Sequence, residues 1–214
     1  MKVKKGMLGH IIVDNNIGVS KMGFETLVTE VGLALKEQGR MVVTAESCTG
    51  GMIAEALTCV GGSTAWFDRA YITYSYESKK EMLGINEATI QKKGAVSQEC
   101  VEEMAIAALQ QSHATVSVSC SGIAGPGGGT PDKPVGTVWI AWAMQGHENI
   151  ESQRFQFDGD RQSVREQTTE AALMGIMQLL KSWLCSKFVL ILCWVCRNKW
   201  TQYVTQCDTH SVEK

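Results

Sequence analysis

Apolar residues recur along this chain first with the period of a helix and then with that of a strand, and this alternation limits the fold most. A helical stripe at 24–39 is followed by a short β-branched run at 41–46. Further helical patterns lie at 52–60, 78–85, 87–93, 97–112 and 161–184, and strand patterns at 66–75, 114–122, 135–144 and 150–157. This alternation is typical of a layered α/β domain. Because no helix separates the last three strands, we expect a mixed sheet.

Composition excludes several classes of function. The 214 residues carry 20 Lys and Arg against 22 Asp and Glu, a net charge of −2. Such a balance disfavours nucleic acid as the main partner, because phosphate neutralisation needs a basic surface. The longest apolar run, 188–196, is far shorter than the roughly 20 residues of a membrane-spanning helix. We therefore expect neither nucleic acid nor membrane as a partner.

The N-terminus lacks the apolar stretch of a secretory signal, so we expect a cytoplasmic protein with reduced thiols. Four of the eight cysteines lie in the main body, beside apolar or helical stretches. We interpret these four as small core residues: Cys48, Cys59, Cys100 and Cys120.

A serine follows the first buried strand directly, in Ser47-Cys48-Thr49-Gly50-Gly51, and a helical pattern comes next. Free N–H groups at the start of a helix can hold a phosphate or a developing oxyanion, and glycines allow a ligand to approach closely. The alternative is that a hydroxyl here serves only as a helix N-cap, which is the more common use of such residues.

A lysine is expected in the first turn of a later helix, in the segment 74–79 that begins with Tyr74 at a strand end. The helix dipole disfavours a cation there, which would lower the pKa of Lys79 and favour its action as a base. The alternative is an ordinary surface lysine, as we expect for Lys80. We also expect Ser78 and Glu81 to form a capping box, and Asn86 to cap the next helix.

A glycine-rich loop follows the strand at 114–122 and runs from Ser121 to Thr130. Successive N–H groups in such a loop can form an anion-binding nest, although a flexible surface loop is the alternative. Arg161 and Arg165, one helical turn apart, could clamp a phosphate or carboxylate, or pair with Asp158 or Asp160.

The sequence does not match several known catalytic motifs. Ser47 does not lie in a G-x-S-x-G elbow, and no H-E-x-x-H motif occurs. The four histidines lie in loops or near the ends of the chain, so a Ser-His-Asp triad lacks good candidates. A Ser-Lys pair fits these residues better.

These segments together resemble the CinA C-terminal-domain family, in particular its stand-alone bacterial nicotinamide-nucleotide amidohydrolases of the PncC type. The matching stretches are TAESCTGG at 44–51, GGSTAWFDRAYITYSYESKKEMLGI at 61–85, GAVSQECVEEMA at 94–105, SVSCSGIAGPGGGTPDKPVGTVWIA at 117–141 and FDGDRQSVR at 157–165. The resemblance implies a three-layer α/β/α sandwich with a mixed central sheet. It also implies an enzyme that converts nicotinamide mononucleotide (NMN) to nicotinate mononucleotide and ammonia, without metal or other cofactor.

The resemblance also implies roles for single residues. Ser47 would be the nucleophile, Lys79 the base that activates it, and Tyr74 a residue that orients or relays the proton. Backbone N–H groups at 48–50 are candidates for the oxyanion hole. The implied substrate-binding set is Thr49, Gly50, Ser121, Gly125, Gly127, Gly128 and Arg161, with the loop Gly125–Gly129 and Arg161 at the phosphate. A homo-oligomer is the expected assembly.

The resemblance covers about 23–180 and predicts three parts: an atypical extension at 1–21, an amidohydrolase domain at 22–184 and an atypical tail at 185–214. Two other functions remain open. One is a non-catalytic nucleotide-binding or regulatory module. The other is a zinc-stapled interaction protein, since the tail carries a set with zinc-ligand chemistry: Cys193, Cys196, Cys207 and His210. A chance occurrence of these cysteines and this histidine in the tail is the better explanation.

Overall fold

The structure is a computed structural model that describes residues 21–147 and 149–207. Its elements follow the predicted alternation of helices and strands. In chain order they are α1 (Lys21–Glu37), β1 (Val42–Glu46), α2 (Met52–Thr58), a 3-10 turn (Ser63–Ala65), β2 (Phe67–Ile72), α3 (Tyr76–Leu83), α4 (Glu87–Lys93), α5 (Gln98–Gln110), β3 (Val116–Gly122), β4 (Thr137–Met144), β5 (Glu151–Gln156) and α6 (Arg161–Cys207).

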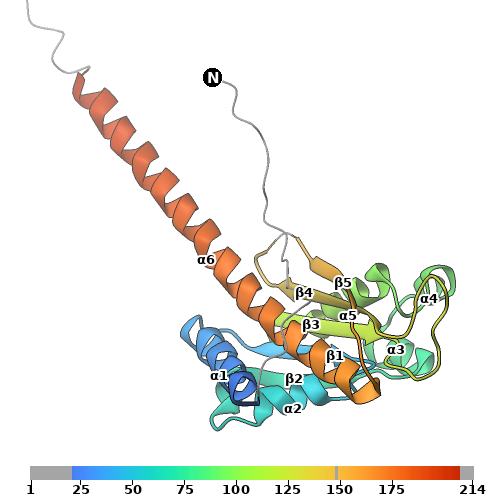
Figure 1. Ribbon diagram of the computed structural model, residues 1–214. Coiled ribbons are helices and arrows are strands. Elements are labelled where there is room, and N and C mark those ends of the chain that lie inside the picture. The colour runs from blue at the N-terminus through green and yellow to red at the C-terminus, as the bar shows by residue number, and fades with distance from the viewer. Residues whose placement is uncertain (1–20, 148, 208–214) are drawn as a thin grey trace, which may run out of the picture. The chain divides into compact units, whose positions relative to one another are not determined.

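The five strands form one sheet in the order β2-β1-β3-β4-β5 (Figure 1). The central strand β1 pairs in parallel with β2 and β3, whereas β3–β4 and β4–β5 are antiparallel. The mixed sheet expected from three strands without an intervening helix is therefore confirmed.

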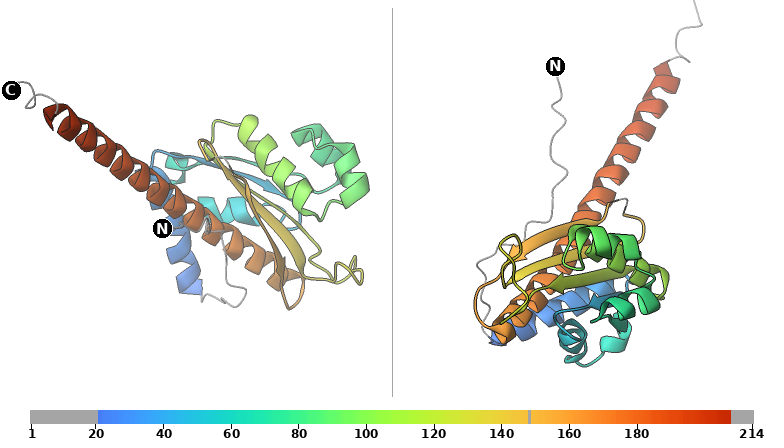
Figure 2. Two further views of the ribbon diagram at one scale, coloured as in Figure 1. Left: turned by 90° about the horizontal axis from the view of Figure 1, so that it is seen from above. Right: turned by 90° about the vertical axis from the view of Figure 1, so that its right-hand side faces the viewer.

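Helices cover both faces of the sheet, which gives the three layers that the resemblance implied (Figure 2). On one face α3, α4 and α5 pack over Val43 and Ala45 of β1. On the other face lie α1, α2 and the beginning of α6. The side of β3 that faces α5 carries small residues: Ser117 and Ser119 donate to helix carbonyls of Ala105 and Val101.

The long helix α6 differs from its predicted span of 161–184. The chain divides into two compact units at Leu179 and Leu180, and α6 contributes to both. The second unit is helical from 180 to 207. No glycine or proline lies between 176 and 207, so nothing in the sequence ends the helix at 184. The proposed zinc ligands lie outside the described residues: His210 itself, and the side chains of Cys193, Cys196 and Cys207.

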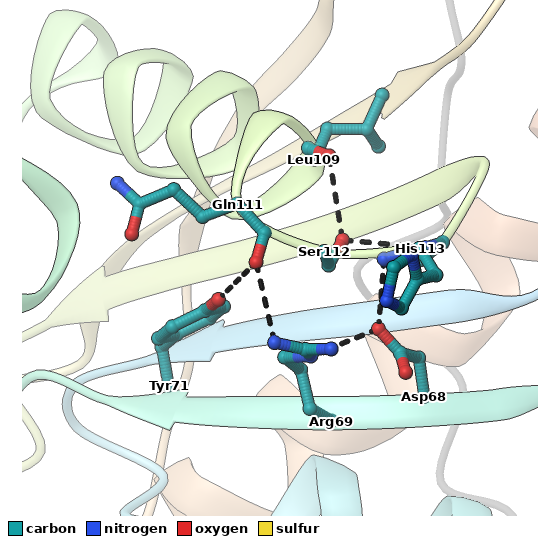
Figure 3. A network of polar contacts seen from close by, with 8 residues as sticks. Asp68, Arg69, Tyr71, Leu109, Gln111, Ser112 and His113 are labelled. Carbon is teal, nitrogen blue, oxygen red and sulfur yellow. Dashed lines mark hydrogen bonds and ion pairs between the residues drawn. The ribbon is translucent and has the colours of Figure 1, made fainter.

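A polar network joins the edge strand β2 to the end of α5 (Figure 3). The hydroxyl of Tyr71 donates to the carbonyl of Gln111 at 2.6 Å. The carboxylate of Asp68 accepts from Arg69 and from the backbone amide of His113. Charged residues on an edge strand also oppose pairing with a foreign strand.

Three of the four body cysteines are core residues as predicted: Cys48, Cys100 and Cys120. Cys59 is exposed, because α2 ends at Thr58 and leaves it in the following turn. The predicted capping box of Ser78 with Glu81 was also wrong. The N-cap of α3 is Ser75, and its partner in the box is Ser78.

The first turns of α6 are held against the sheet by Trp142 of β4. This indole is fully buried and donates to the carbonyl of Ala172 at 2.9 Å. Gly175 lies under the ring, and a Cβ added there would overlap the indole atoms. A glycine is therefore required at this helix position by packing.

We expect Gly175→Ala to lower the free energy of unfolding by about 1–3 kcal/mol, because overpacking outweighs the better helix propensity of alanine. Urea denaturation measures this loss. Gly61→Ala is the control, since a Cβ at Gly61 meets nothing within 4 Å. Equal stability of the two variants would contradict the packing account.

Candidate active site

The carboxyl ends of three parallel strands meet at one edge of the sheet. Glu46, the last residue of β1, pairs in register with Ile72 of β2 and Cys120 of β3. The next residue along each chain segment is therefore brought to the same edge: Ser47, Thr73 and Ser121. Ligand sites in open α/β sheets commonly lie at this edge, beside the switch in strand order.

Ser47 begins a tight turn that leads into α2. The turn is closed by the N–H of Gly50, which donates to the Ser47 carbonyl at 3.1 Å, and Gly50 adopts a positive φ of 61°. The amide of Ser47 donates to the Cys120 carbonyl at 3.2 Å. Ser47 and its turn are thus fixed to β3 as well as to β1.

The buried carboxylate of Glu46 holds this turn from the inside. Its two oxygens accept from two hydroxyls and three backbone amides at 2.7–3.2 Å: those of Thr44 and Thr49, and those of Gly51, Ile53 and Ala54. The amides belong to the start of α2, whose positive dipole end suits a carboxylate. The hydroxyl N-cap is therefore wrong here, because the N-cap is Gly51 and Glu46 takes these donors. A ligand at the remaining amides of the turn stays a prediction.

Arg165 of α6 holds the same turn from the outside. Its Nε and Nη2 both donate to the Thr49 carbonyl, at 3.3 and 2.8 Å, and its Nη1 donates to Gln162. The predicted ion pairs of this arginine with Asp158 or Asp160 are not among the salt bridges of the described residues. Arg165 therefore orients the last peptide of the Ser47 turn.

Lys79 lies in the first turn of α3, as the sequence predicted. Its Nζ is 3.0 Å from Ser47 Oγ and donates to the Thr73 carbonyl at 2.6 Å. Only 1% of the residue is exposed, which excludes the surface-lysine alternative. Burial lowers the pKa of the Lys79 amine below its usual value. A larger share of the amine is then neutral and can accept the proton of the serine hydroxyl.

Cys48 lies next to Ser47 but does not have the properties of a nucleophile. Its hydrogen bond with Cys120 and its burial raise the pKa of the Cys48 thiol well above its usual value. A thiol attacks as the thiolate, so this cysteine stays unreactive near neutral pH. The amine of Lys79 contacts the Ser47 hydroxyl, so Ser47 is the candidate nucleophile of this site.

A cavity of about 210 Å³ contains the pair. It brings together five of the predicted site residues, namely Ser47, Lys79, Tyr74, Ser121 and Arg161. The other lining residues were not found from the sequence: Cys48, Tyr76, Ala95, Val96, Gly122 and Ala124. The position of Tyr76, three residues before Lys79 on a helix, was the one signal that could have placed it on the same face.

Arg161 connects three walls of this cavity. From the start of α6, its Nη1 donates to the Gly125 carbonyl at 3.0 Å and its Nη2 to the Tyr74 hydroxyl at 2.9 Å. Tyr74 follows β2 instead of ending it, and 59% of it is exposed. Its hydroxyl accepts from Arg161 and helps to orient the arginine, and its role in the proton transfer stays a prediction.

Other predicted binding residues do not line the cavity. The hydroxyl of Thr49 is buried against Glu46 and Cys120, and the amide of Gly50 is used inside the turn. The loop glycines likewise are absent from the cavity wall: Gly125, Gly127 and Gly128. Gly125 instead supplies the carbonyl that Arg161 binds.

A larger hollow of about 640 Å³ lies between α1, α2 and α6. Glutamates line it, including Glu55 and Glu166, together with Phe24 and Met52. The smaller cavity contains the contact between Ser47 and Lys79 and is therefore the candidate active site.

The model of the CinA C-terminal domain family matches residues 24–180. The chain belongs to this family. Among its relatives, the protein named nicotinamide-nucleotide amidohydrolase PncC from Escherichia coli K12 is 51% identical over 152 residues, 71% of this chain and 92% of that protein. The protein of the same name from Pseudomonas putida is 53% identical over 154 residues, 72% and 95% of the two chains.

Solved structures of the family share this fold. The competence-damaged protein (CinA) superfamily protein from Klebsiella pneumoniae aligns with a TM-score of 0.72 and 38% identity, covering 75% of this chain and 99% of that one. In the described part of the chain, no helix has the length and apolar character needed to cross a membrane, and no group of three or more His, Cys, Asp or Glu could hold a metal ion.

We expect Glu46→Gln to lower the free energy of unfolding by about 3 kcal/mol, because the amide group presents N–H donors to N–H donors in a buried place. Thr44→Val, which removes one of the hydroxyls that Glu46 accepts from, is the control and should cost about 1 kcal/mol. Guanidinium denaturation of the two variants checks this order. A Glu46→Gln variant no less stable than Thr44→Val would contradict the role given to the carboxylate.

Proposed function

We propose that this chain hydrolyses the carboxamide of NMN, with Ser47 as nucleophile and Lys79 as general base. The contact of 3.0 Å between Lys79 Nζ and Ser47 Oγ, inside a cavity and away from water, is the observation that supports the proposal most. The names and identities of the relatives support the choice of substrate.

The first half of the reaction forms an ester. Neutral Lys79 takes the hydroxyl proton while Ser47 Oγ attacks the amide carbon. The tetrahedral intermediate then collapses, the C–N bond breaks, and the ammonium of Lys79 returns its proton to the departing nitrogen, which leaves as ammonia. In the second half a water molecule attacks the ester carbon and gives a proton to Lys79. The bond between that carbon and Ser47 Oγ then breaks, Lys79 returns the proton to Ser47 Oγ, and the carboxylic acid leaves.

The developing oxyanion needs preorganised donors. Within the described residues the N–H of Gly50 is taken by the Ser47 carbonyl, whereas that of Cys48 donates to no backbone carbonyl. Cys48 also lines the cavity, so its N–H is the proposed oxyanion donor. Arg165 and Glu46 hold the Ser47 turn from opposite sides and keep this amide in place.

The cavity volume limits how a nucleotide can lie. At about 210 Å³ it is smaller than the usual range of about 300–1,000 Å³ for ligand pockets. The carboxamide ring would enter, with the Ser121 hydroxyl near it, and the ribose phosphate would remain at the rim. Arg161 lines that rim and uses two of its five N–H donors on the protein, which leaves others for phosphate.

The exposed glycine loop provides further donors at this rim. Among the described residues, the amides of Gly127 and Gly128 have no acceptor, in keeping with an anion nest. The homo-oligomer, the cytoplasmic location and the three-part division of the chain stay predictions.

We expect Ser47→Ala and Lys79→Met to lower the rate of ammonia release from NMN at least about a thousandfold, as is usual for members of a catalytic unit. Lys80→Met is the matched control. It removes the next lysine of the same helix, which contacts Glu87 at the surface, and should keep the rate within about twofold. A coupled ammonia assay measures the rate, and calorimetry measures whether each variant still binds NMN.

Binding of NMN by the unmodified chain without release of ammonia would favour a non-catalytic nucleotide-binding module instead. Near-normal turnover by Lys79→Met would remove the lysine from its proposed role.

A further inference from the structure

Two tyrosines line the cavity, Tyr74 and Tyr76, and they differ in the contacts of their hydroxyl groups. The Tyr76 hydroxyl makes no hydrogen bond with any described residue, whereas those of Tyr71 and Tyr74 contact Gln111 and Arg161. Although it lines the cavity, 57% of Tyr76 is exposed. Removing apolar surface from water is favourable by about 25 cal/mol per Å², so a ligand that covers the ring gains binding free energy.

The position of the ring follows from the start of α3. Ser75 and Ser78 form the capping box that fixes Tyr76 as the first helical residue. Residues three apart share a helix face, so Tyr76 lies on the same face as Lys79. Both line the same cavity, and the ring is therefore placed beside the base.

The other walls leave room for a flat ligand. Ala95, Gly122 and Ala124 present little or no side chain to the cavity. The ring of Tyr74 has its hydroxyl bonded to Arg161. Tyr76 thus offers an aromatic face next to the reacting groups and, unlike Tyr74, has no hydrogen bond to a described residue that fixes its ring.

We propose that the ring of Tyr76 stacks on the positively charged pyridinium of the substrate and selects it over neutral pyridine carboxamides. This inference rests on the proposed function and extends it to the electronic character of the ring. In NMN the ring nitrogen is bonded to ribose and carries a positive charge, and a cation is attracted to the face of an aromatic side chain. Free nicotinamide is neutral and lacks this attraction.

The test compares Tyr76→Leu, which keeps an apolar side chain without a π face, with Tyr76→Phe, which keeps the ring. We expect Tyr76→Leu to raise the KM for NMN about three- to thirtyfold with kcat little changed, since a cation–π contact has this magnitude. Tyr76→Phe should stay within about twofold, because the hydroxyl has no partner to lose. Inhibition by neutral nicotinamide should change much less than binding of NMN.

Met82→Ala is the matched control on α3, since Met82 is 41% exposed and does not line the cavity. It should leave KM unchanged. Calorimetric binding of NMN to Ser47→Ala, with and without Tyr76→Leu, measures the same contact without turnover.

An unchanged affinity for NMN in Tyr76→Leu would overturn the inference, as would equal losses for NMN and nicotinamide. Failure of the proposed function has a different signature. The unmodified chain would then release no ammonia from NMN, while the calorimetric comparison would still decide whether Tyr76 binds the ring.

Discussion

The parallel pairing of β1 with both of its neighbours is the constraint on which the site depends. It carries the ends of β1, β2 and β3 to one edge of the sheet, where Ser47, the Thr73 carbonyl and Ser121 lie together. Glu46 then fixes the turn after β1 by accepting from the start of α2, and Arg165 fixes it from α6. Ser47 is held by backbone geometry and by buried polar contacts, so it has little freedom to adjust. A site of this kind is preorganised for the attack that we propose.

The second requirement is an amine kept away from water. Helix α3 places Lys79 under the turn, and the Thr73 carbonyl accepts one of its protons. Burial of a cation without a carboxylate costs free energy, which shifts the equilibrium toward the neutral form. The folded protein therefore binds fewer protons at this site than the unfolded chain. Its stability gains from rising pH between the lowered pKa of Lys79 and that of an ordinary lysine. Burial of Lys79 thus lowers the free energy of unfolding near neutral pH and makes the amine a better proton acceptor.

The sequence predicted the order of helices and strands, the mixed sheet and the two residues that meet in the cavity, Ser47 and Lys79, since periodicity and the residues at strand ends carry that information. It did not predict how Glu46 is used, because a carboxylate inside a buried strand gives no local sign of the helix start that it will cap. It assigned Thr49 to the substrate, whereas the Thr49 hydroxyl donates to Glu46, because hydroxyl residues occur both in structural turns and in binding loops. The assignment of the loop glycines to the substrate stays a prediction. Tyr76 was missed because its exposure to a cavity depends on the packing of α3. The end of α6 was misplaced, since a change in composition does not end a helix.

The central claim is that burial lowers the pKa of the Lys79 amine, so that more of it is neutral than in an ordinary lysine. Titration of its ε-carbon signal by NMR tests this claim most directly. Lys80 is the internal reference, because its contact with Glu87 raises the pKa of that surface amine. A Lys79→Arg variant identifies the signal by its loss. The account predicts that Lys79 titrates below the usual lysine range and well before Lys80 as the pH rises. A Lys79 signal that titrates together with that of Lys80 would contradict it.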